Sequence, residues 1–496
     1  MWQRLERREI RHRAPRPAGA PPRPDLPPGT DLLPQIKHIV VLMMENHSYD
    51  NYLGMLPGRG DGLPPVPGTH HLTSTAGQAG NPTQTWRASH LQYSDGFPVS
   101  AELTVPGGDP ANSMGYWTEQ DLPFYYGLAR TFPLADRWFC SCLGPTFPNR
   151  RFLISGTAHG LIDDLLWDVI DYPPGGTIFD ALTSNGISWV NYHNVSPVRV
   201  LLRRLLGGGG LIAARRLARV GRWLPPVLNT VRGNKSFTAD VYPLGLARAV
   251  LHLRTMRRFF ADADAGTLPS FSIVDPDFAA FSEENPQDIR KGESFAAEVI
   301  NRVMHGKAWR DTLLIWTYDE HGGYYDHVPP PPAAEPDNVP AHNFQLELPS
   351  WVQRLPPLRR LFAQLEDADA GPPDYGRYGF RVPAVIVSPY ARRDYVCSTV
   401  LDHTSILKLI EEKWNLPSLT HRDAAATSPL EALNLEAPPA FATPPHLPAP
   451  SLPWGSWLLH LTPPAPHLPH WPHHPHKPQP PRPALTHGYQ WRHRYP

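Results

Sequence analysis

The stretch that decides the fold is IKHIVVLMMENHSYDNYLG, which spans residues 36–54. Its apolar run, residues 39–44, is short and rich in Val and Leu, and it predicts a buried strand. The run stops abruptly at Glu45 and Asn46, which bring two oxygen-bearing side chains to the end of the strand. This pattern predicts a ligand site beyond the carboxyl end of a strand.

A second stretch, TLLIWTYDEHGGYYDHVPP at residues 312–330, repeats the pattern. Its apolar run leads into Asp319 and Glu320. Because parallel strands place ligand sites just past their carboxyl ends, the two acidic pairs are expected to converge on one crevice. Three converging carboxylates would repel one another without a cation, and their oxygens suit a hard divalent ion. The alternative is that the pairs stay apart, with Glu45 as a helix cap and Asp319 as a turn residue.

A third stretch, LGPTFPNRRFLISG at residues 143–156, predicts a helix with Thr146 as its cap, Pro148 in its first turn and Gly156 after its end. The Thr146 hydroxyl would then lie at the positive end of the helix, where free backbone amides attract a phosphate. Contact with a divalent cation can deprotonate this weak nucleophile and direct its oxygen at phosphorus. The motif alone suggests a plain cap, but the acidic pairs favour the nucleophile.

Three histidines are candidates for phosphate contact or proton transfer. His321 and His327 flank the loop at residues 322–326, whose glycines allow a close approach to a ligand. Either imidazole could bind a phosphoryl oxygen or protonate a leaving alkoxide. Asp402 could orient His403 toward the same crevice, or the two could form an ordinary helix cap.

From about residue 34 to 435, apolar runs alternate with helical patterns, which predicts a doubly wound α/β domain. Further strands are expected at residues 186–192, 269–274 and 382–387, and helices at residues 294–304 and 405–414.

Proline, with 62 residues, is the outlier in the composition and gathers near both ends of the chain. We therefore expect residues 1–30 to be a disordered Pro/Arg-rich extension, residues 31–435 the catalytic domain, and residues 436–496 an extended Pro/His-rich tail without a catalytic part. A basic insertion at about residues 197–235 interrupts the domain. Its segment 198–223 alternates Arg with Leu, Ile and Val, so it either contacts an anionic membrane surface or packs on the domain.

Charge and cysteine content exclude some classes of protein. Lys+Arg and Asp+Glu are 46 each, so no basic excess points to nucleic acid. No apolar run is long enough for a membrane span, and the N-terminus lacks the apolar core of a secretory signal. The chain as written is therefore expected to be cytoplasmic, with export left open. Cys140, Cys142 and Cys397 are expected to be buried thiols rather than a disulfide framework or zinc site.

The motifs MMENHSYDNYLG, GPTFPNRRFLISGT, YDEHGGYYDHVPPP and LDHTSILKLIEEKW resemble those of a bacterial phosphoesterase family. That family includes phosphatidylcholine-type phospholipases C and an acid phosphatase branch, and it belongs to the alkaline phosphatase-like superfamily. The similarity runs from about residue 36 to 433. It implies a three-layer αβα fold with a mostly parallel sheet, a covalent phospho-enzyme, and one divalent metal ion. The implied metal ligands are Glu45, Asn46, Thr146, Asp319 and Glu320.

One departure from this family concerns a histidine. Where many members have Asp-His-Pro, this chain has Glu284, Asn285 and Pro286, so Asn285 can hydrogen-bond a phosphate but cannot transfer a proton near neutral pH. His327 or His403 would have to take that role. Asn46, His321 and Asn285 are then expected to contact the substrate.

The sequence therefore predicts a metal-dependent phosphoric ester hydrolase, with a phospholipid headgroup ester as the first choice of substrate, chiefly through the resemblance. The alternatives are a phosphomonoesterase with the same nucleophile and a catalytically silent protein that binds lipid surfaces. A sulfatase-like relative is disfavoured because Thr146 cannot supply the modified Cys or Ser that sulfatases need. The metal could be Mg, Ca, Mn or Zn, and the oligomeric state stays open.

Overall fold

The structure is a computed structural model that describes residues 19–75, 82–97, 110–164, 172–193, 238–241, 250–278, 280–341 and 375–452. The chain divides into two compact units, residues 1–454 and 455–496. The second unit and the whole basic insertion predicted at residues 197–235 lie outside the described residues. The insertion includes the segment 198–223, which was expected either to contact a membrane surface or to pack on the domain.

An eight-stranded sheet forms the centre of the first unit, in the order β10-β4-β9-β8-β1-β7-β5-β6. Its strands are β1 (His38–Met44), β4 (Leu134–Ala135), β5 (Trp189–His193), β6 (Leu253–Thr255), β7 (Phe271–Val274), β8 (Thr312–Tyr318), β9 (Ala384–Val387) and β10 (Val396–Cys397). A separate two-stranded sheet pairs β2 (His70–His71) with β3 (Gly115–Tyr116). Strand β9 is antiparallel to both of its neighbours, and the other pairings within the large sheet are parallel.

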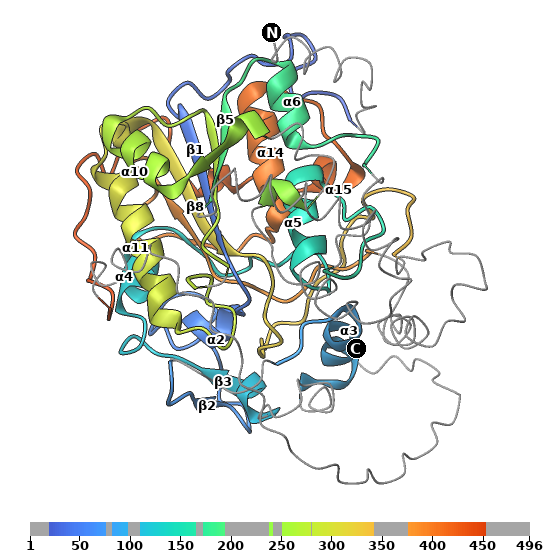
Figure 1. Ribbon diagram of the computed structural model, residues 1–496, viewed down its shortest axis with the longest axis vertical. Helices are drawn as coiled ribbons and strands as arrows, with labels where there is room; N and C mark the ends of the chain where they lie inside the picture. Colours follow the sequence, from blue (N-terminus) through green and yellow to red (C-terminus); the bar gives the residue numbers. More distant parts are fainter. Residues whose placement is uncertain are drawn as a thin grey trace, which may run out of the picture. The chain divides into compact units, whose positions relative to one another are not determined.

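The middle of the sheet is buried on both faces, as expected for parallel strands covered by helices. Every residue of β7 and β8 is buried, and so is all of β1 except its first residue. Helices cover both faces: α4, α10 and α11 lie on one side and α5, α6, α14 and α15 on the other (Figure 1). This arrangement confirms the predicted α/β class and three-layer sandwich.

The helices are α2 (Tyr49–Leu53), α3 (Trp86–Asp95), α4 (Pro123–Thr131), α5 (Thr146–Ser155), α6 (Ile178–Ser184), α10 (Met256–Ala265), α11 (Ile289–His305), α14 (His403–Trp414) and α15 (His421–Ala425). Short 3-10 helices are η2 (Pro110–Met114), η3 (Thr238–Asp240), η4 (Val250–His252), η5 (Trp309–Asp311) and η7 (Pro429–Ala432). The longest, α11, begins after Asp288, whose side chain accepts a hydrogen bond from the Arg290 amide and satisfies one of the free donors.

Parts of the two predicted extensions lie against the catalytic domain. The Gly29 amide donates to the carbonyl of Trp414 at 2.8 Å, at the end of α14. Near the other end of the chain, the buried Phe441 packs on Phe132, and its carbonyl accepts a hydrogen bond from the Trp309 indole. The compact unit therefore extends beyond the predicted boundaries at residues 30 and 435. Among the described residues, no helix is both long and apolar enough to cross a membrane.

Candidate active site

The ends of β1 and β8 lie side by side, with Met44 paired to Tyr318 in parallel register. Asn46, two residues after the end of β1, and Asp319, directly after the end of β8, are therefore brought together, and the Asn46 backbone amide donates to Asp319 Oδ1 at 3.3 Å. Asn46 adopts a left-handed backbone with φ of 69°, which asparagine tolerates better than most residues. The two predicted acidic pairs thus end on one edge of the sheet, and they are fully buried.

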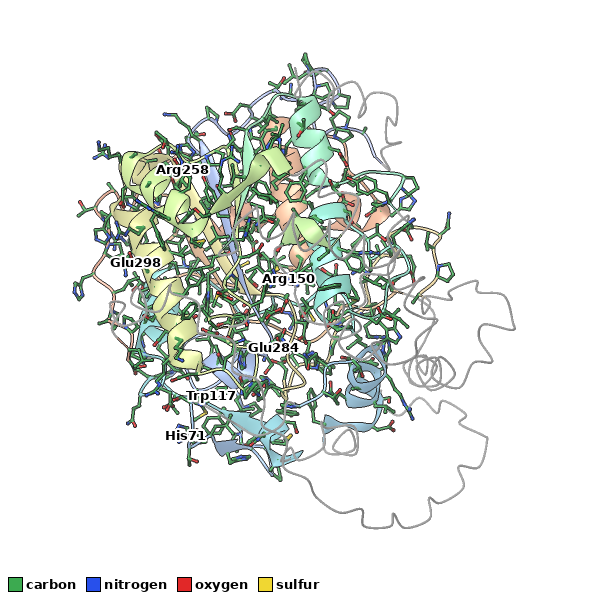
Figure 2. All side chains as sticks on the ribbon, viewed as in Figure 1. His71, Trp117, Arg150, Arg258, Glu284 and Glu298 are labelled. Atoms are coloured by element: carbon green, nitrogen blue, oxygen red, sulfur yellow. The ribbon has the colours of Figure 1, made fainter. Side chains whose placement is uncertain are left out.

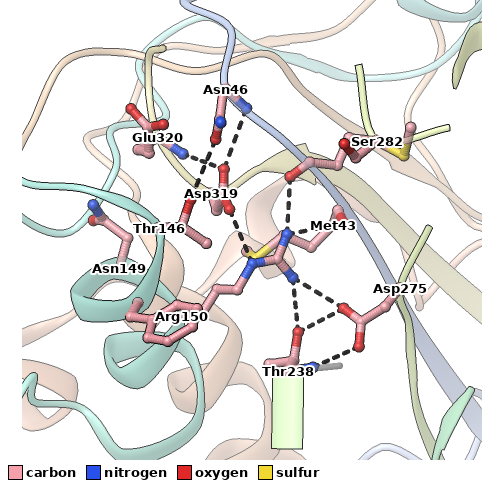
Figure 3. Close-up of polar contacts among 12 residues, drawn as sticks. Met43, Asn46, Thr146, Asn149, Arg150, Thr238, Asp275, Ser282, Asp319 and Glu320 are labelled. Atoms are coloured by element: carbon pink, nitrogen blue, oxygen red, sulfur yellow. Dashed lines mark hydrogen bonds and ion pairs between the residues drawn. The ribbon is translucent and has the colours of Figure 1, made fainter. Parts of the chain in front are cut away.

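Thr146 is the first residue of α5, and Pro145 occupies the capping position. The sequence expectation that Thr146 caps this helix is therefore wrong by one position. Its hydroxyl points instead toward the side chain of Asn46, with 3.4 Å between Thr146 Oγ1 and Asn46 Oδ1 (Figure 3). Gly156 ends the helix in a left-handed conformation, as predicted.

Three side-chain oxygens and the side-chain amide of Asn46 gather at this point. Asn46 Oδ1 lies 3.0 Å from Asp319 Oδ1, 2.7 Å from Glu320 Oε1 and 3.4 Å from Thr146 Oγ1. An amide oxygen facing two carboxylates is repulsive unless a cation lies between them or the amide turns over and donates its two protons. Oxygens about 2.1 Å from a Mg²⁺ ion in octahedral geometry lie about 3.0 Å apart, so these separations fit a divalent cation.

Arg150 joins α5, the helix that begins with Thr146, to the ends of three strands. From α5 it donates to Asp319 Oδ2 at 2.9 Å and to Asp275 Oδ1 at 2.9 Å (Figure 3). It also donates to the Met44 carbonyl at 3.2 Å. It lies in the interior, whereas Arg258 lies at the edge of the molecule (Figure 2). Burial alone would lower the pKa of Arg150, but the charges of Asp319, Asp275 and Glu45 outweigh it and raise that pKa.

Glu45 is buried beside this network, and its amide donates to the Ser282 carbonyl at 3.0 Å. Asn285, in the same segment as Ser282, donates its side-chain amide to the Tyr324 hydroxyl. The Glu45 charge therefore acts on Arg150 within the site, while Asn285 is held by a phenol from the loop after β8. Substrate contact by Asn285 stays a prediction.

The imidazole of His403 contacts the backbone carbonyl of Asp319. Its Nε2 lies 2.7 Å from the Asp319 carbonyl, and the Trp138 indole donates to its Nδ1 at 3.4 Å. Burial lowers the pKa of His403 to about 4, so the ring is neutral, with its proton on Nε2. Asp402 bonds Ser141 and Thr404, and no bond joins it to His403. Because both ring nitrogens are engaged, the geometry favours a positioning role over proton donation.

His321 is buried next to Glu320, with its Nδ1 3.4 Å from Glu320 Oε2. Its Nε2 donates to Gln92 Oε1 at 2.7 Å, because the Gln92 amide nitrogen is already bonded to the Thr83 carbonyl. Burial lowers the pKa of His321 to about 3. The neutral ring therefore offers Nδ1 as an acceptor, and contact of His321 with a phosphoryl oxygen stays a prediction.

The loop that carries His321 fits closely against the β1 end because Gly322 has no side chain. A Cβ on Gly322 would lie 2.0 Å from the Asn46 carbonyl oxygen, and φ at Gly322 is 68°. The Gly322 amide also donates to Glu320 Oε2 at 2.7 Å. Glycine is thus required here for both the backbone conformation and the close approach of the two strand ends.

His327 belongs to a second cluster, built from α2 and the loop after β8. Its Nδ1 lies 2.7 Å from Asp50 Oδ2, and its Nε2 lies 3.4 Å from the half-exposed Asp61. Burial would lower the pKa of His327, but the hydrogen bond to Asp50 and its charge raise it. The side chain of His327 is 17% exposed, so this His–Asp pair is not fully buried.

Within the described residues, this cluster also brings together three side chains that could hold a metal ion. They are Asp50, Asp326 and His327, whose possible ligand atoms all lie within 4.8 Å of one another. Arg381 already neutralises it, donating to Asp50 Oδ1 at 3.0 Å and to Asp326 Oδ1 at 2.8 Å. A metal ion would have to displace a fully buried guanidinium. Around Asn46 the guanidinium of Arg150 contacts Asp319 through Oδ2, whereas Asp319 Oδ1 faces the Asn46 side chain.

Comparison with known proteins gives the chain a family. Residues 36–417 match the family model described as the Phosphoesterase family. The chain belongs to the Phosphoesterase family.

Two curated relatives of this phosphoesterase are Phospholipase C B of Mycobacterium tuberculosis and Non-specific phospholipase C6 of Arabidopsis thaliana. The first is 30% identical over 82% of this chain and 79% of its own length. The second is 28% identical over 79% of this chain and 71% of its own length. Among solved structures, Ps i-CgsB in complex with k-i-k-neocarrahexaose has a TM-score of 0.35 at 9% identity, covering 81% of this chain and 78% of that chain. The family match and the two phospholipase C relatives together show that this chain is a phosphoric ester hydrolase.

Two residues of this phosphoesterase site were missed by the sequence reasoning. Asp275 directly follows β7, so the rule that located Asp319 would also have located it. Arg150 lies inside the Thr146 motif, but its contacts with three strand ends could not be predicted from a helical pattern. A further contact was also unforeseen: the Phe147 amide, at the start of α5, donates to Asp164 Oδ1 at 2.8 Å.

Proposed function

We propose that this chain hydrolyses the headgroup phosphodiester of a phospholipid, in the manner of a phospholipase C, through a phospho-threonine on Thr146. The observation that carries the proposal is the gathering of Thr146 Oγ1, the Asn46 side-chain amide and two carboxylate oxygens at adjacent strand ends. A hydroxyl at such a place is suited to nucleophilic attack rather than to helix capping.

Asn46, Asp319, Glu320 and Thr146 would hold the divalent cation, with Glu45 adding charge beside them. The cation would supply charge neutralisation at the phosphoryl oxygens and would favour the alkoxide form of Thr146. Arg150 keeps the Asp319 carboxylate in one orientation through Oδ2, and His403 holds its backbone. Hydrogen-bonded partners of this kind fix the geometry of ligands.

In the first step, Thr146 Oγ bonds to phosphorus, and the bond from phosphorus to the departing alcohol oxygen breaks. The alcohol oxygen needs a proton as it leaves, and His327 is our candidate donor. Its pair with Asp50 keeps the proton on Nδ1 and supports the protonated ring, so Nε2–H can be donated toward solvent-accessible space. His327 would thereby take the role that the missing family histidine leaves open.

In the second step, water attacks the phosphorus atom of phospho-threonine from the opposite side and restores the Thr146 hydroxyl. His321 supports this step because its Nδ1 can accept a hydrogen bond next to Glu320. The products are the free alcohol and a phosphate ester of the other substituent.

The choice of a phospholipid rests on the names of the phospholipase C relatives, whose sequences align with about four-fifths of this chain. A phospholipase C acts on a diester and releases a phosphorylated headgroup and a diacylglycerol. The phosphomonoesterase alternative uses the same nucleophile and differs in the charge of the substrate. Substrate comparison is therefore part of the test.

The test incubates the purified full chain with phosphatidylcholine vesicles and measures phosphocholine and diacylglycerol together. We expect both products in equal amounts, loss after chelation, and recovery on addition of one of Mg²⁺, Ca²⁺, Mn²⁺ or Zn²⁺. Thr146→Ala should abolish turnover, while Thr146→Ser should retain it. The matched control is Thr267→Ala, an exposed threonine at the end of α10, which should behave as wild type.

Acid quenching during turnover should trap phosphate on the peptide that contains Thr146. Full activity of the Thr146→Ala variant would refute the nucleophile. Release of inorganic phosphate from monoesters without any diester cleavage would instead favour the phosphomonoesterase.

A further inference from the structure

The first described segment after the basic insertion lies between α5 and the sheet. It consists of η3 (Thr238–Asp240) and Val241, and the side chains that the structure describes in it are buried. The Ala239 amide donates to Asn191 Oδ1 on β5 at 2.8 Å. From α5, Arg151 Nε donates to the Val241 carbonyl at 3.0 Å. The segment is therefore bonded both to a strand of the sheet and to the helix that carries Arg150.

Thr238 makes three hydrogen bonds in this position. Its backbone amide donates to Asp275 Oδ2 and its hydroxyl donates to Asp275 Oδ1, both at 2.6 Å. The same hydroxyl accepts a hydrogen bond from Arg150 Nη1 at 2.8 Å (Figure 3). A hydroxyl can donate one proton and accept at the same time, and Thr238 uses both abilities here. Its side chain thus fixes Asp275 and Arg150 relative to each other.

The orientation of Arg150 determines how Asp319 is held. Arg150 Nη1 is shared between the Thr238 hydroxyl and Asp275 Oδ1. Nε of the same guanidinium donates to Asp319 Oδ2 at 2.9 Å. Because the guanidinium group is planar and rigid, acceptors that fix Nη1 also fix the direction of the Nε–H bond. A change in the acceptors at Nη1 is therefore transmitted to the Asp319 carboxylate.

We propose that Thr238 is a positioning residue for the cation site: its hydroxyl orients the Arg150 guanidinium, which holds the Asp319 carboxylate in place for the cation. This inference rests on the function proposed above, in which Asp319 is a ligand of that cation. Thr238 acts through Arg150 and is not itself a ligand. A buried hydroxyl that only completed its own turn would add stability and leave the affinity for the cation unchanged.

Two substitutions separate positioning from simple stability. Thr238→Val keeps the branched shape but removes the hydroxyl, so Arg150 Nη1 loses one acceptor and Asp275 loses one donor. Thr238→Ser keeps the hydroxyl. The matched control is Thr312→Val, which removes another buried hydroxyl that donates to a backbone carbonyl at 2.7 Å. Thr312 is the first residue of β8, whereas Asp319 follows the last residue of that strand.

The experiment titrates the metal-free full chain with Mn²⁺ in a calorimeter, for wild type and each variant. We expect Thr238→Val to bind Mn²⁺ about tenfold more weakly than wild type, because loss of a partner that orients a metal ligand costs about 10- to 100-fold in affinity and Thr238 acts through a second residue. Thr238→Ser should bind as tightly as wild type. Thr312→Val should also keep its affinity, although it loses stability.

Turnover of phosphatidylcholine gives a second measurement of the same effect. In Thr238→Val the Mn²⁺ concentration that gives half of the maximal rate should rise by about the same factor of ten. The maximal rate at saturating Mn²⁺ should stay close to that of wild type, because mass action refills a weakened site. A purely structural role for Thr238 would not change the dependence of the rate on Mn²⁺ concentration.

Equal Mn²⁺ affinity in wild type and in folded Thr238→Val would overturn the inference, and so would an equal loss of affinity in Thr312→Val. If Thr238→Val does not fold by circular dichroism, Thr238→Ala decides by the same measurement. A wild-type chain that binds Mn²⁺ but hydrolyses no phosphatidylcholine would overturn the proposed function alone, and the affinities of the variants would still decide the role of Thr238.

Discussion

Replacing Arg150 by Met tests whether one side chain holds α5, with the proposed nucleophile Thr146, to the strand ends that carry the proposed metal ligands. The change keeps the volume of the side-chain stem but leaves Asp319 and Asp275 buried without their shared guanidinium. Removing one partner of a buried ion pair costs about 3–5 kcal/mol. For a compact unit of residues 1–454, at about 2.1 cal/mol/K per residue, a loss of about 4 kcal/mol lowers Tm by about 4 °C.

The more specific effect is on metal affinity. Asp319 Oδ2 would lose its anchor, and the loss of a residue that orients a metal ligand weakens metal binding by about 10- to 100-fold. Calorimetric titration of the metal-free protein with Mn²⁺ measures this directly, and kcat should fall in parallel at limiting metal. Arg150→Lys should recover only part of the affinity, since an ammonium group lacks the planar fork that reaches Asp319 and Asp275 together.

Arg151→Met is the matched control because Arg151 is equally buried on the same helix. Its bonds include the carbonyls of Val241 and Ala158 rather than Asp319. This variant should lose stability but keep its metal affinity. If both variants bind Mn²⁺ as tightly as wild type, or if both lose affinity equally, Arg150 does not act through Asp319 and the reasoning is refuted.

Three further outcomes are expected. Because the pKa of His327 is raised, kcat should fall as pH rises through that raised value. In His327→Gln this alkaline fall should disappear from the pH profile, and kcat should drop by about 10²- to 10⁴-fold. An unchanged alkaline fall in the variant would exclude His327 as the proton donor. Asn46→Asp adds a third carboxylate to the oxygen cluster, so Tm in chelator should drop by several degrees and recover with Mn²⁺; equal loss with and without metal would contradict the cation site. Burial raises the pKa of Glu411 from 4.5 to about 10, so the folded state retains a proton that the unfolded state releases, and the free energy of unfolding falls as pH rises between these values. Relative to wild type, Glu411→Gln should therefore gain stability by at most about 1.4 kcal/mol per pH unit, measured by urea unfolding at pH 5 and pH 8. An equal difference between the two proteins at both pH values would be the contrary result.

The strand ends were predictable because they depend on short local patterns. A buried run such as residues 39–44 can end only where polar groups begin, and the parallel-sheet rule then places those groups on one edge. The same argument covers residues 313–316 and Asp319, and the register of β1 with β8 brings the two ends together. Applied once more, it would have found Asp275.

The histidines were less predictable because a histidine's role depends on what each ring nitrogen faces. His403 and His321 both lie near the oxygen cluster, yet their tautomers are set by Trp138 and Gln92, which are distant in sequence. His327 is paired with Asp50 rather than with a residue of its own loop. A pattern of residue types cannot reveal these partners.

The sequence by itself determined the α/β class, the buried strands and the side chains at their carboxyl ends, because hydrophobic periodicity and strand-end chemistry are local properties. Only the tertiary structure decided that Arg150 contacts Asp319 and Asp275, and that Asp164 covers the amide beside Thr146. Such contacts depend on which loops the packed sheet and helices bring within about 3 Å of one another, because hydrogen bonds act only over that distance.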